Sequence, residues 1–160
     1  MADIRDWGAF IRGRWDWNRG GFEKGFPRGC QFTDVDASIE FNGWYLLKET
    51  KHHDGIGPCE YPSTGQLISL RREVELGKTV FVLYGCGACS SPQAVRILGS
   101  SMDKSDDIWI DLRDIPSIEE RRKRYKHLID AALGWDGQQW RIHHPEETIN
   151  WKEVVQPWQE

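Results

Sequence analysis

The chain has 160 residues and a formal net charge of −4, with 29% charged and 12% aromatic side chains. This length suffices for one domain with a substantial buried core. An acidic protein is a poor candidate for coating nucleic acid without specificity, because such binding neutralises phosphates with basic side chains. No apolar run approaches the roughly 20 residues that cross a bilayer. The sequence begins without a secretory signal pattern, so we expect a cytoplasmic protein.

The N-terminal segment predicts a helix followed by a loop. Residues 4–17 carry apolar side chains at the three- and four-residue spacing of an amphipathic helix, namely Trp7, Phe10, Ile11 and Trp15. Asn18-Arg19-Gly20-Gly21 ends this pattern. The glycine-rich stretch that continues to residue 29, and contains Glu23, is typical of a loop.

Asn42-Gly43 predicts a tight β-hairpin within residues 32–51. Both residues accept the positive φ that a two-residue type I′ turn requires. With this turn as the pivot, Asp36 opposes Glu49 and Asp34 opposes Lys51. Alternation along the strands then places these four side chains on one face. The other face is expected to point into the core and carries Val35, Ala37, Ile39, Phe41, Trp44 and Leu46.

The shared face predicts a metal site. Carboxylates directly opposed on a sheet repel each other, so Asp36 and Glu49 require a compensating cation or a shared proton. A divalent ion is the simplest compensation, and oxygen ligands of this kind suit Mg²⁺ or Mn²⁺. Lys51 projects onto the same face, where its ammonium could hold a water or stabilise developing negative charge.

The middle of the chain predicts a helix and a buried strand. Ser63 or Thr64 is a suitable N-cap for a helix that stops at Gly77 and buries Leu67, Leu70, Val74 and Leu76. Residues 79–84, TVFVLY, form a nearly continuous apolar run. Such a run is typical of a strand covered on both faces, so we expect it inside the sheet beside the strand that carries Glu49.

The remaining residues predict two strands, a helix and a packed tail. The strands are expected at residues 93–98 and 107–112. Residues 116–133 predict a helix capped by Gly134, with apolar positions at Ile118, Tyr125, Leu128, Ile129 and Ala132. The tail from residue 135 contains several tryptophans and is expected to pack on the body.

One motif in this pattern resembles a known signature. Asp36, twelve intervening residues and then Glu49-Thr50-Lys51 resemble the D…ExK motif of the PD-(D/E)xK nuclease superfamily, especially its phage and RecB-like members. The resemblance covers about residues 26–84. It implies an α/β (α+β) fold with a restriction-endonuclease-like core, in which helices flank a central mixed β-sheet. We therefore expect a single domain over residues 1–160, with its core at about 26–133 and a C-terminal tail at 134–160.

The resemblance implies a function and roles for the motif residues. The activity would be Mg²⁺- or Mn²⁺-dependent hydrolysis of phosphodiester bonds in DNA. Asp36, Glu49 and the carbonyl of Thr50 would bind the metal, while Lys51 would position the attacking water. Gln66 matches the placement of a glutamine near the metal site of RecB-like nucleases; an exposed helix glutamine is the alternative.

Two further acids are candidate metal ligands. Asp34 lies on the acidic face, although it could instead pair with Lys51 across the hairpin. Glu23 would be the upstream acid that many members of the superfamily use. In those relatives this acid commonly lies on the first helix, whereas Glu23 falls in a predicted loop.

Other polar groups have two interpretations each. His52 and His53 follow the ExK strand and could contact phosphate, or be an ordinary polar loop pair. Cys86 and Cys89 form a lone CxxC motif, which is a weak indication of a zinc site. The alternative is that they are free thiols. The basic run within residues 119–126 is best explained as a solvated helix face, with contact to the DNA backbone as the alternative.

A second function remains open from the sequence. A nuclease-like fold that binds nucleic acid or a protein partner without cutting also agrees with the acidic charge and the tryptophan-rich tail. The residues favour neither DNA nor RNA by themselves, and the resemblance makes DNA the expected partner. Related small nucleases are often dimers, which makes a homodimer an expectation to test. The phage-like motif suggests a viral protein that acts in the host cytoplasm.

Overall fold

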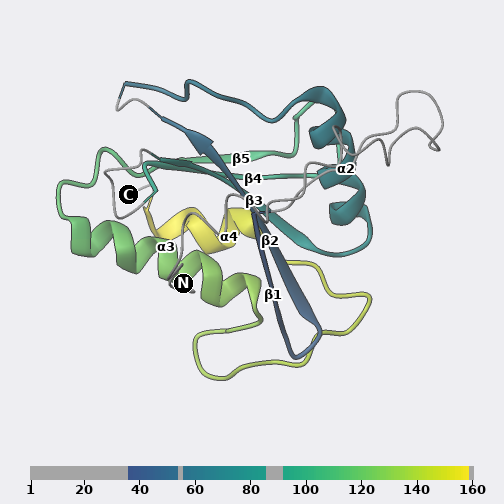
Figure 1. Ribbon diagram of the computed structural model, residues 1–160. Coiled ribbons are helices and arrows are strands. Elements are labelled where there is room, and N and C mark those ends of the chain that lie inside the picture. The colour runs from purple at the N-terminus through teal and green to yellow at the C-terminus, as the bar shows by residue number, and fades with distance from the viewer. Residues whose placement is uncertain (1–35, 54–55, 86–91, 159–160) are drawn as a thin grey trace, which may run out of the picture. The chain divides into compact units, whose positions relative to one another are not determined.

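The computed structural model describes residues 36–53, 56–85 and 92–158 (Figure 1). These residues belong to one compact unit that spans Val35–Glu160. The predicted first helix, Glu23, Asp34 and the cysteines at 30, 86 and 89 lie outside the described residues.

The described part has an α+β fold, as expected. In chain order its elements are β1 (Ala37–Phe41), β2 (Trp44–His52), α2 (Thr64–Glu75), β3 (Thr79–Gly85), β4 (Ala94–Ile97), β5 (Ile108–Asp111), α3 (Ile118–Ala132), α4 (Trp151–Val155) and the 3-10 helix η2 (Gln156–Trp158). The strands form one mixed sheet in the order β1-β2-β3-β4-β5. β2 and β3 run parallel, and the other neighbouring pairs are antiparallel. No helix in the described ranges combines the length and the apolar character needed to cross a membrane.

The predicted hairpin is confirmed. Asn42 has φ 51° and Gly43 has φ 84°, which is the left-handed conformation that a type I′ turn requires. Phe41 pairs with Trp44, and the paired register extends to Ala37 and Lys48. The backbone amide of Gly43 also donates to Glu40 Oε1 at 2.6 Å, which holds the turn closed.

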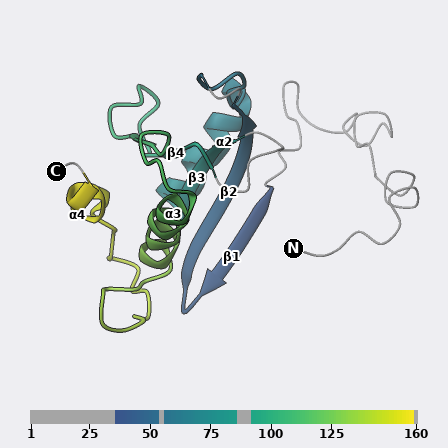
Figure 2. The same cartoon turned by 90° about the vertical axis from the view of Figure 1, so that its left-hand side faces the viewer.

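Helices cover the two faces of the sheet separately (Figures 1 and 2). α2 packs through Leu70 on one face, against a buried cluster from β2, β3 and β4 that contains Leu47, Val80, Val82, Tyr84 and Ala94. α3 packs on the other face with α4, where Leu128 and Val155 meet a cluster that contains Trp44, Leu46, Phe81, Leu83, Val95 and Ile97. Since β3 contributes to both clusters, the prediction that the TVFVLY strand is buried on both faces is confirmed.

The ends of both long helices agree with the sequence. Ser63 caps α2 by accepting from the amide of Gln66 at 3.2 Å, and Gly77 follows the helix with φ 86°. Ser117 caps α3, which therefore begins two residues after the predicted start. Gly134 ends α3 with φ 89°, and a Cβ there would come within 2.2 Å of the Trp44 indole. Only glycine fits this position without a shift of the tryptophan.

The tail packs on the body, as predicted. Val155 is buried, and Trp151 lies edge-to-face against Phe81 with ring centroids 5.5 Å apart. The indole nitrogen of Trp44 donates to the carbonyl of Arg141 at 3.0 Å, which ties the tail to β2.

The expectation that β1 points into the core is wrong in part. Trp44 and Leu46 are buried, but Ile39 is 49% exposed and Phe41 is also exposed. β1 is an edge strand, and the helices pack over β2, β3 and β4. The side chains that alternate to that face of β1 are therefore not buried. Two helix positions were also mispredicted: Leu76, which lies beyond the last turn of α2, is 73% exposed, and Ile118 in the first turn of α3 is exposed.

A buried ionic network joins α2 to β4 and to the residue that precedes β5. Asp107 accepts from Arg71 at 2.7 and 2.9 Å, from Arg96 at 2.8 Å and from the amide of Gly99 at 3.0 Å. All three charged side chains are almost inaccessible to solvent. Water compensates these charges little, which makes the network sensitive to the loss of one member.

We predict that Asp107→Asn destabilises the protein strongly, because it leaves two arginines buried without their anion. The expected loss in the free energy of unfolding is about 3–5 kcal/mol. Asp111→Asn is the matched control, since Asp111 pairs with Arg113 near the surface and should contribute less than about 1 kcal/mol. Urea unfolding followed by tryptophan fluorescence measures both; equal losses would contradict the prediction.

The same network predicts an acid-sensitive contribution to stability. Burial alone would raise the pKa of Asp107, but the hydrogen bonds from Arg71, Gly99 and Arg96 outweigh it and lower the pKa overall. An aspartate in the unfolded chain titrates near ~3.9, so this contribution is complete above that pH and is lost as the pH falls through the lower folded pKa. The stability difference between wild type and Asp107→Asn should therefore shrink below about pH 4. A difference that stays constant down to the acid transition would contradict this expectation.

Candidate functional site

Three of the predicted site residues meet in the structure. Glu49 Oε1 accepts from the ammonium of Lys51 at 2.8 Å and from Nε2 of Gln66 at 2.5 Å. Glu49 and Lys51 come from β2, whereas Gln66 comes from the first turn of α2. The motif acid, the motif lysine and the helix glutamine thus form one hydrogen-bonded group.

The path of the chain explains this meeting. Glu49 and Lys51 are two residues apart on one strand and so share a face of the sheet. β2 and β3 are parallel, which requires a crossover, and α2 provides it over that face. The Ser63 cap fixes the first turn of α2, which places Gln66 above Glu49.

Glu49 is unusual because it is a buried carboxylate, and one of its two oxygens, here called the open oxygen, has no hydrogen-bond partner among the described residues. The residue is 4% exposed, and among the described residues its Oε2 meets no hydrogen-bond donor. Burial of a charged oxygen without a partner is costly, and most such oxygens in proteins are satisfied. The open oxygen is therefore well suited to bind a cation.

Asp36 is not part of this hydrogen-bonded group and instead binds Thr50, the residue between Glu49 and Lys51. One oxygen of its carboxylate accepts from the backbone amide of Thr50 at 2.6 Å and from the Thr50 hydroxyl. The amide and carbonyl of one strand residue point to the same edge, so the carbonyl of Thr50 also points toward the edge where Asp36 lies. The paired register ends at Ala37 and Lys48, one residue short of the expected pair between Asp36 and Glu49.

Glu60 is an acid at the same edge that the sequence analysis did not identify. Its Oε2 accepts from the amide of His52 at 3.3 Å, while the carbonyl of His52 accepts from the amide of Cys59 at 3.0 Å. The amides of Thr50 and His52 point to one edge of β2, so Asp36 and Glu60 bind successive positions there. No periodic pattern marks this loop, and only its return to β2 brings Glu60 to this edge.

His52 and His53, the two candidate histidines, have different environments. His52 is exposed at the end of β2. His53 is buried, its backbone amide donates to the carbonyl of Gly85 at 2.9 Å, and it forms a β-bridge with Pro58. His52 is therefore the histidine that a ligand at this edge could reach.

Tyr84 is a second residue that the sequence did not indicate. It is the register partner of Lys51 on β3 and is fully buried. Its hydroxyl is buried, with the Arg96 side chain close to it. Burial raises the pKa of Tyr84, and the Arg96 cation opposes that shift only in part. Tyr84 therefore remains a neutral side chain beside the lysine.

The donor set is compatible with a hard divalent ion. In the described ranges, no three His, Cys, Asp or Glu side chains gather as a metal cluster. Glu49 Oε2, the Asp36 carboxylate and the Thr50 carbonyl are nevertheless oxygen donors of the kind that Mg²⁺ and Mn²⁺ prefer. The other two predicted ligands, Asp34 and Glu23, lie outside the described residues.

The basic run of α3 is not on this face. α3 packs on the side of the sheet opposite α2, so its charges project away from Glu49. Within the helix, Glu120 lies 3.9 Å from Lys123 and 3.8 Å from Arg124. The arrangement agrees with the interpretation of this run as a solvated helix face.

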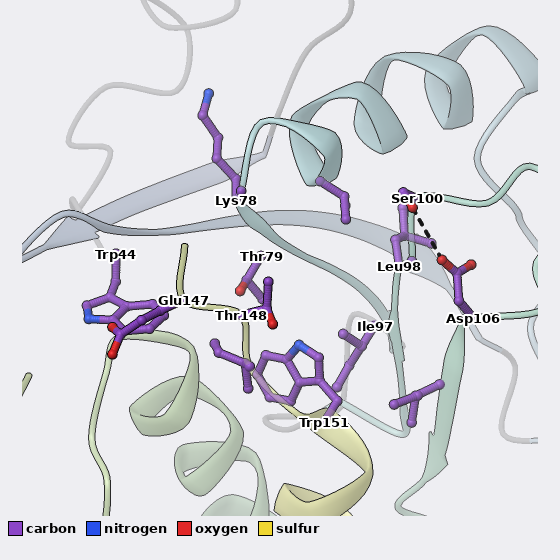
Figure 3. A pocket seen from close by; sticks show the side chains of 15 residues that line it. Trp44, Lys78, Thr79, Ile97, Leu98, Ser100, Asp106, Glu147, Thr148 and Trp151 are labelled. Atoms are coloured by element: carbon purple, nitrogen blue, oxygen red, sulfur yellow. Dashed lines mark hydrogen bonds between the residues drawn. The ribbon is translucent and has the colours of Figure 1, made fainter. Parts of the chain in front are cut away.

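A cavity of about 220 Å³ lies at the other end of β3 (Figure 3). Its lining includes Trp44, Lys78, Thr79 and Trp151, and none of the motif residues. Asp106 points to its rim but accepts from Ser100 at 3.4 Å, which accounts for that carboxylate locally. None of the candidate site residues that the structure describes lines this cavity.

No protein-family model, curated protein or solved structure matches this chain.

We predict that Mn²⁺ or Mg²⁺ raises the thermal unfolding midpoint through Glu49. A ligand that binds only the folded state stabilises it by about 2.7 kcal/mol when present at 100 times its dissociation constant. Glu49→Gln should lose this response. Glu73→Gln, which alters a partly exposed acid in the last turn of the same helix that carries Gln66, should keep it. An identical metal response in wild type and Glu49→Gln would exclude Glu49 as a ligand.

Proposed function

We propose that this chain is a divalent-metal-dependent nuclease that hydrolyses phosphodiester bonds in DNA. The observation that carries the proposal is the buried carboxylate of Glu49, with one oxygen held by Lys51 and Gln66 and the other open. The strand order and the crossover helix support a restriction-endonuclease-like core, which we also propose. Such an activity belongs in the cytoplasm, that of the host for a viral chain, and we propose a homodimer as the state to test first.

The metal would be held by Glu49, Asp36 and the Thr50 carbonyl. When bound, it supplies Lewis acidity, lowers the pKa of water and compensates negative charge on the phosphate oxygens. For Asp36 to join, its carboxylate would exchange at least one bond to Thr50 for the ion. Glu60 could assist from the same edge.

Lys51 and Gln66 would complete the site. In hydrolysis a water oxygen bonds to phosphorus while the phosphorus–oxygen bond to the leaving nucleotide breaks. The ammonium of Lys51 has donors to hold the attacking water and to stabilise charge on the phosphoryl oxygens. Gln66 fixes the orientation of Glu49, because its amide binds the oxygen opposite the open one.

The N-terminus of α2 adds a favourable field. The first turn of this twelve-residue helix contains Gln66 and therefore lies at Glu49. Unpaired amides and the helix dipole favour an anion at such a terminus. A scissile phosphate beside Glu49 would thus gain a contribution that does not depend on the net charge of the chain.

A catalytically inactive nuclease-like module is the second candidate. The engagement of Asp36 with the amide and hydroxyl of Thr50 favours it, because this acid already has partners without a metal. Such a module would bind nucleic acid or a protein and leave the phosphodiester bond intact.

We predict that Glu49→Gln and Lys51→Met each reduce metal-dependent cleavage by at least about 100-fold, because each removes a charge that acts in the transition state. The substrates are plasmid, single-stranded and branched DNA, and a single-stranded RNA, each incubated with Mg²⁺, Mn²⁺ or EDTA.

Glu73→Gln and Lys78→Met are matched controls. Glu73 and Lys78 form a second glutamate–lysine pair at the opposite end of α2, and these variants should cleave like wild type. Cleavage by Glu49→Gln at the wild-type rate would remove this site from consideration. Absence of cleavage by wild type on every substrate would favour the inactive module.

A further inference from the structure

Three aromatic side chains form a row on the face that carries Glu49. Tyr84 occupies the centre, and the Trp109 ring stacks on it with centroids 5.3 Å apart and planes inclined by 21°. Tyr61 also contacts Tyr84, edge-to-face, with ring centroids 6.0 Å apart. The three residues come from β3, β5 and the loop before α2, so the row exists only in the folded chain.

The row begins beside the candidate site. Lys51 pairs with Tyr84, and Tyr84 pairs with Ala94. Cross-strand partners share a face, so all three lie on the α2 side of the sheet. Ala94 has a small side chain, which leaves room for Trp109 to reach Tyr84 across β4. The aromatic surface is therefore continuous with the lysine of the motif.

Trp109 presents its outer face to solvent. Tyr84 is buried beneath it, as is Arg96, whose guanidinium carbon lies 5.2 Å from the indole centroid. Trp109 itself is 48% exposed. The accessible part of this side chain is available to a ligand. Tyr61, at 57% exposed, adds a second accessible ring.

Buried ion pairs hold the support of Trp109. Arg96 is held by Asp107, which also binds Arg71 of α2. The cation under the indole is thus held in place before any ligand arrives, and the ring position is set by packing on Tyr84. A flat, exposed and pre-positioned aromatic surface is the form that nucleic-acid-binding proteins use to stack bases.

We propose that Trp109 and Tyr61 stack unpaired bases next to the scissile phosphate, which makes single-stranded DNA the favoured substrate. This inference rests on the proposed function, because it places the bases relative to the Glu49 site. The acidic chain has little general attraction for phosphate. A stacking contact would supply affinity that the net charge does not, and bases in a duplex are already stacked on each other and cannot use it.

The test measures binding without cleavage. Full-length Glu49→Gln protein in EDTA is titrated into a fluorescently labelled single-stranded oligonucleotide and into its duplex, and anisotropy reports binding. Adding Trp109→Ala should weaken single-strand binding by about tenfold or more and change duplex binding little, whereas Trp109→Phe should retain most of the affinity. Trp140→Ala is the control, since Trp140 is an exposed aromatic that contacts Phe41 at the hairpin.

A second variant protects the test against unfolding. Tyr61→Ala removes a largely exposed loop residue and should weaken single-strand binding in a protein with a wild-type unfolding midpoint. Unchanged single-strand affinity in folded Trp109→Ala and Tyr61→Ala would overturn the inference, even if the nuclease activity is found. Selective loss of single-strand binding in these variants, together with no cleavage by the wild-type protein on any substrate, would support the stacking surface and reject the nuclease proposal. An equal loss of affinity for the single strand and for the duplex would also overturn the inference.

Discussion

The buried carboxylate of Glu49 constrains the arrangement of β2 and α2. A charged oxygen away from water must be compensated where it lies. Lys51 compensates it along the strand, and Gln66 does so from the helix that crosses over the same face. The hydrogen bond from Gln66 also fixes how the first turn of α2 sits on the sheet. One side-chain group therefore links the motif, the crossover and the end of the helix that attracts anions.

The two faces of the sheet have different roles. The face under α3 and α4 is a hydrophobic cluster, and Trp44 ties it to the C-terminal tail. The face under α2 combines apolar packing with buried charge, since Arg71, Arg96 and Asp107 lie there along with Glu49. Polar groups in low-dielectric surroundings hold their geometry strongly. This is why the Arg96 network can support the exposed ring of Trp109 close to the motif.

The site was predictable only where local rules apply. Asn42-Gly43 demands its own turn, so the hairpin register and the shared face of Glu49 and Lys51 followed from residue types and alternation. Gln66 was placed by likeness to a motif. Glu60 and Tyr84 were missed because a loop return and a parallel register bring them to the site, and neither leaves a periodic signal in the chain.

The amino-acid sequence alone determined the strands, the long helices, their caps and the pairing across the tight turn. These features depend on backbone conformation and on the periodic spacing of apolar side chains, which neighbouring residues control. Only the tertiary structure decided that Ile39 and Phe41 of the edge strand stay exposed, that Asp36 binds Thr50, and that one oxygen of Glu49 remains open. Each of these outcomes depends on which surfaces are covered by residues that lie far away in the chain. No short segment of the sequence encodes that coverage.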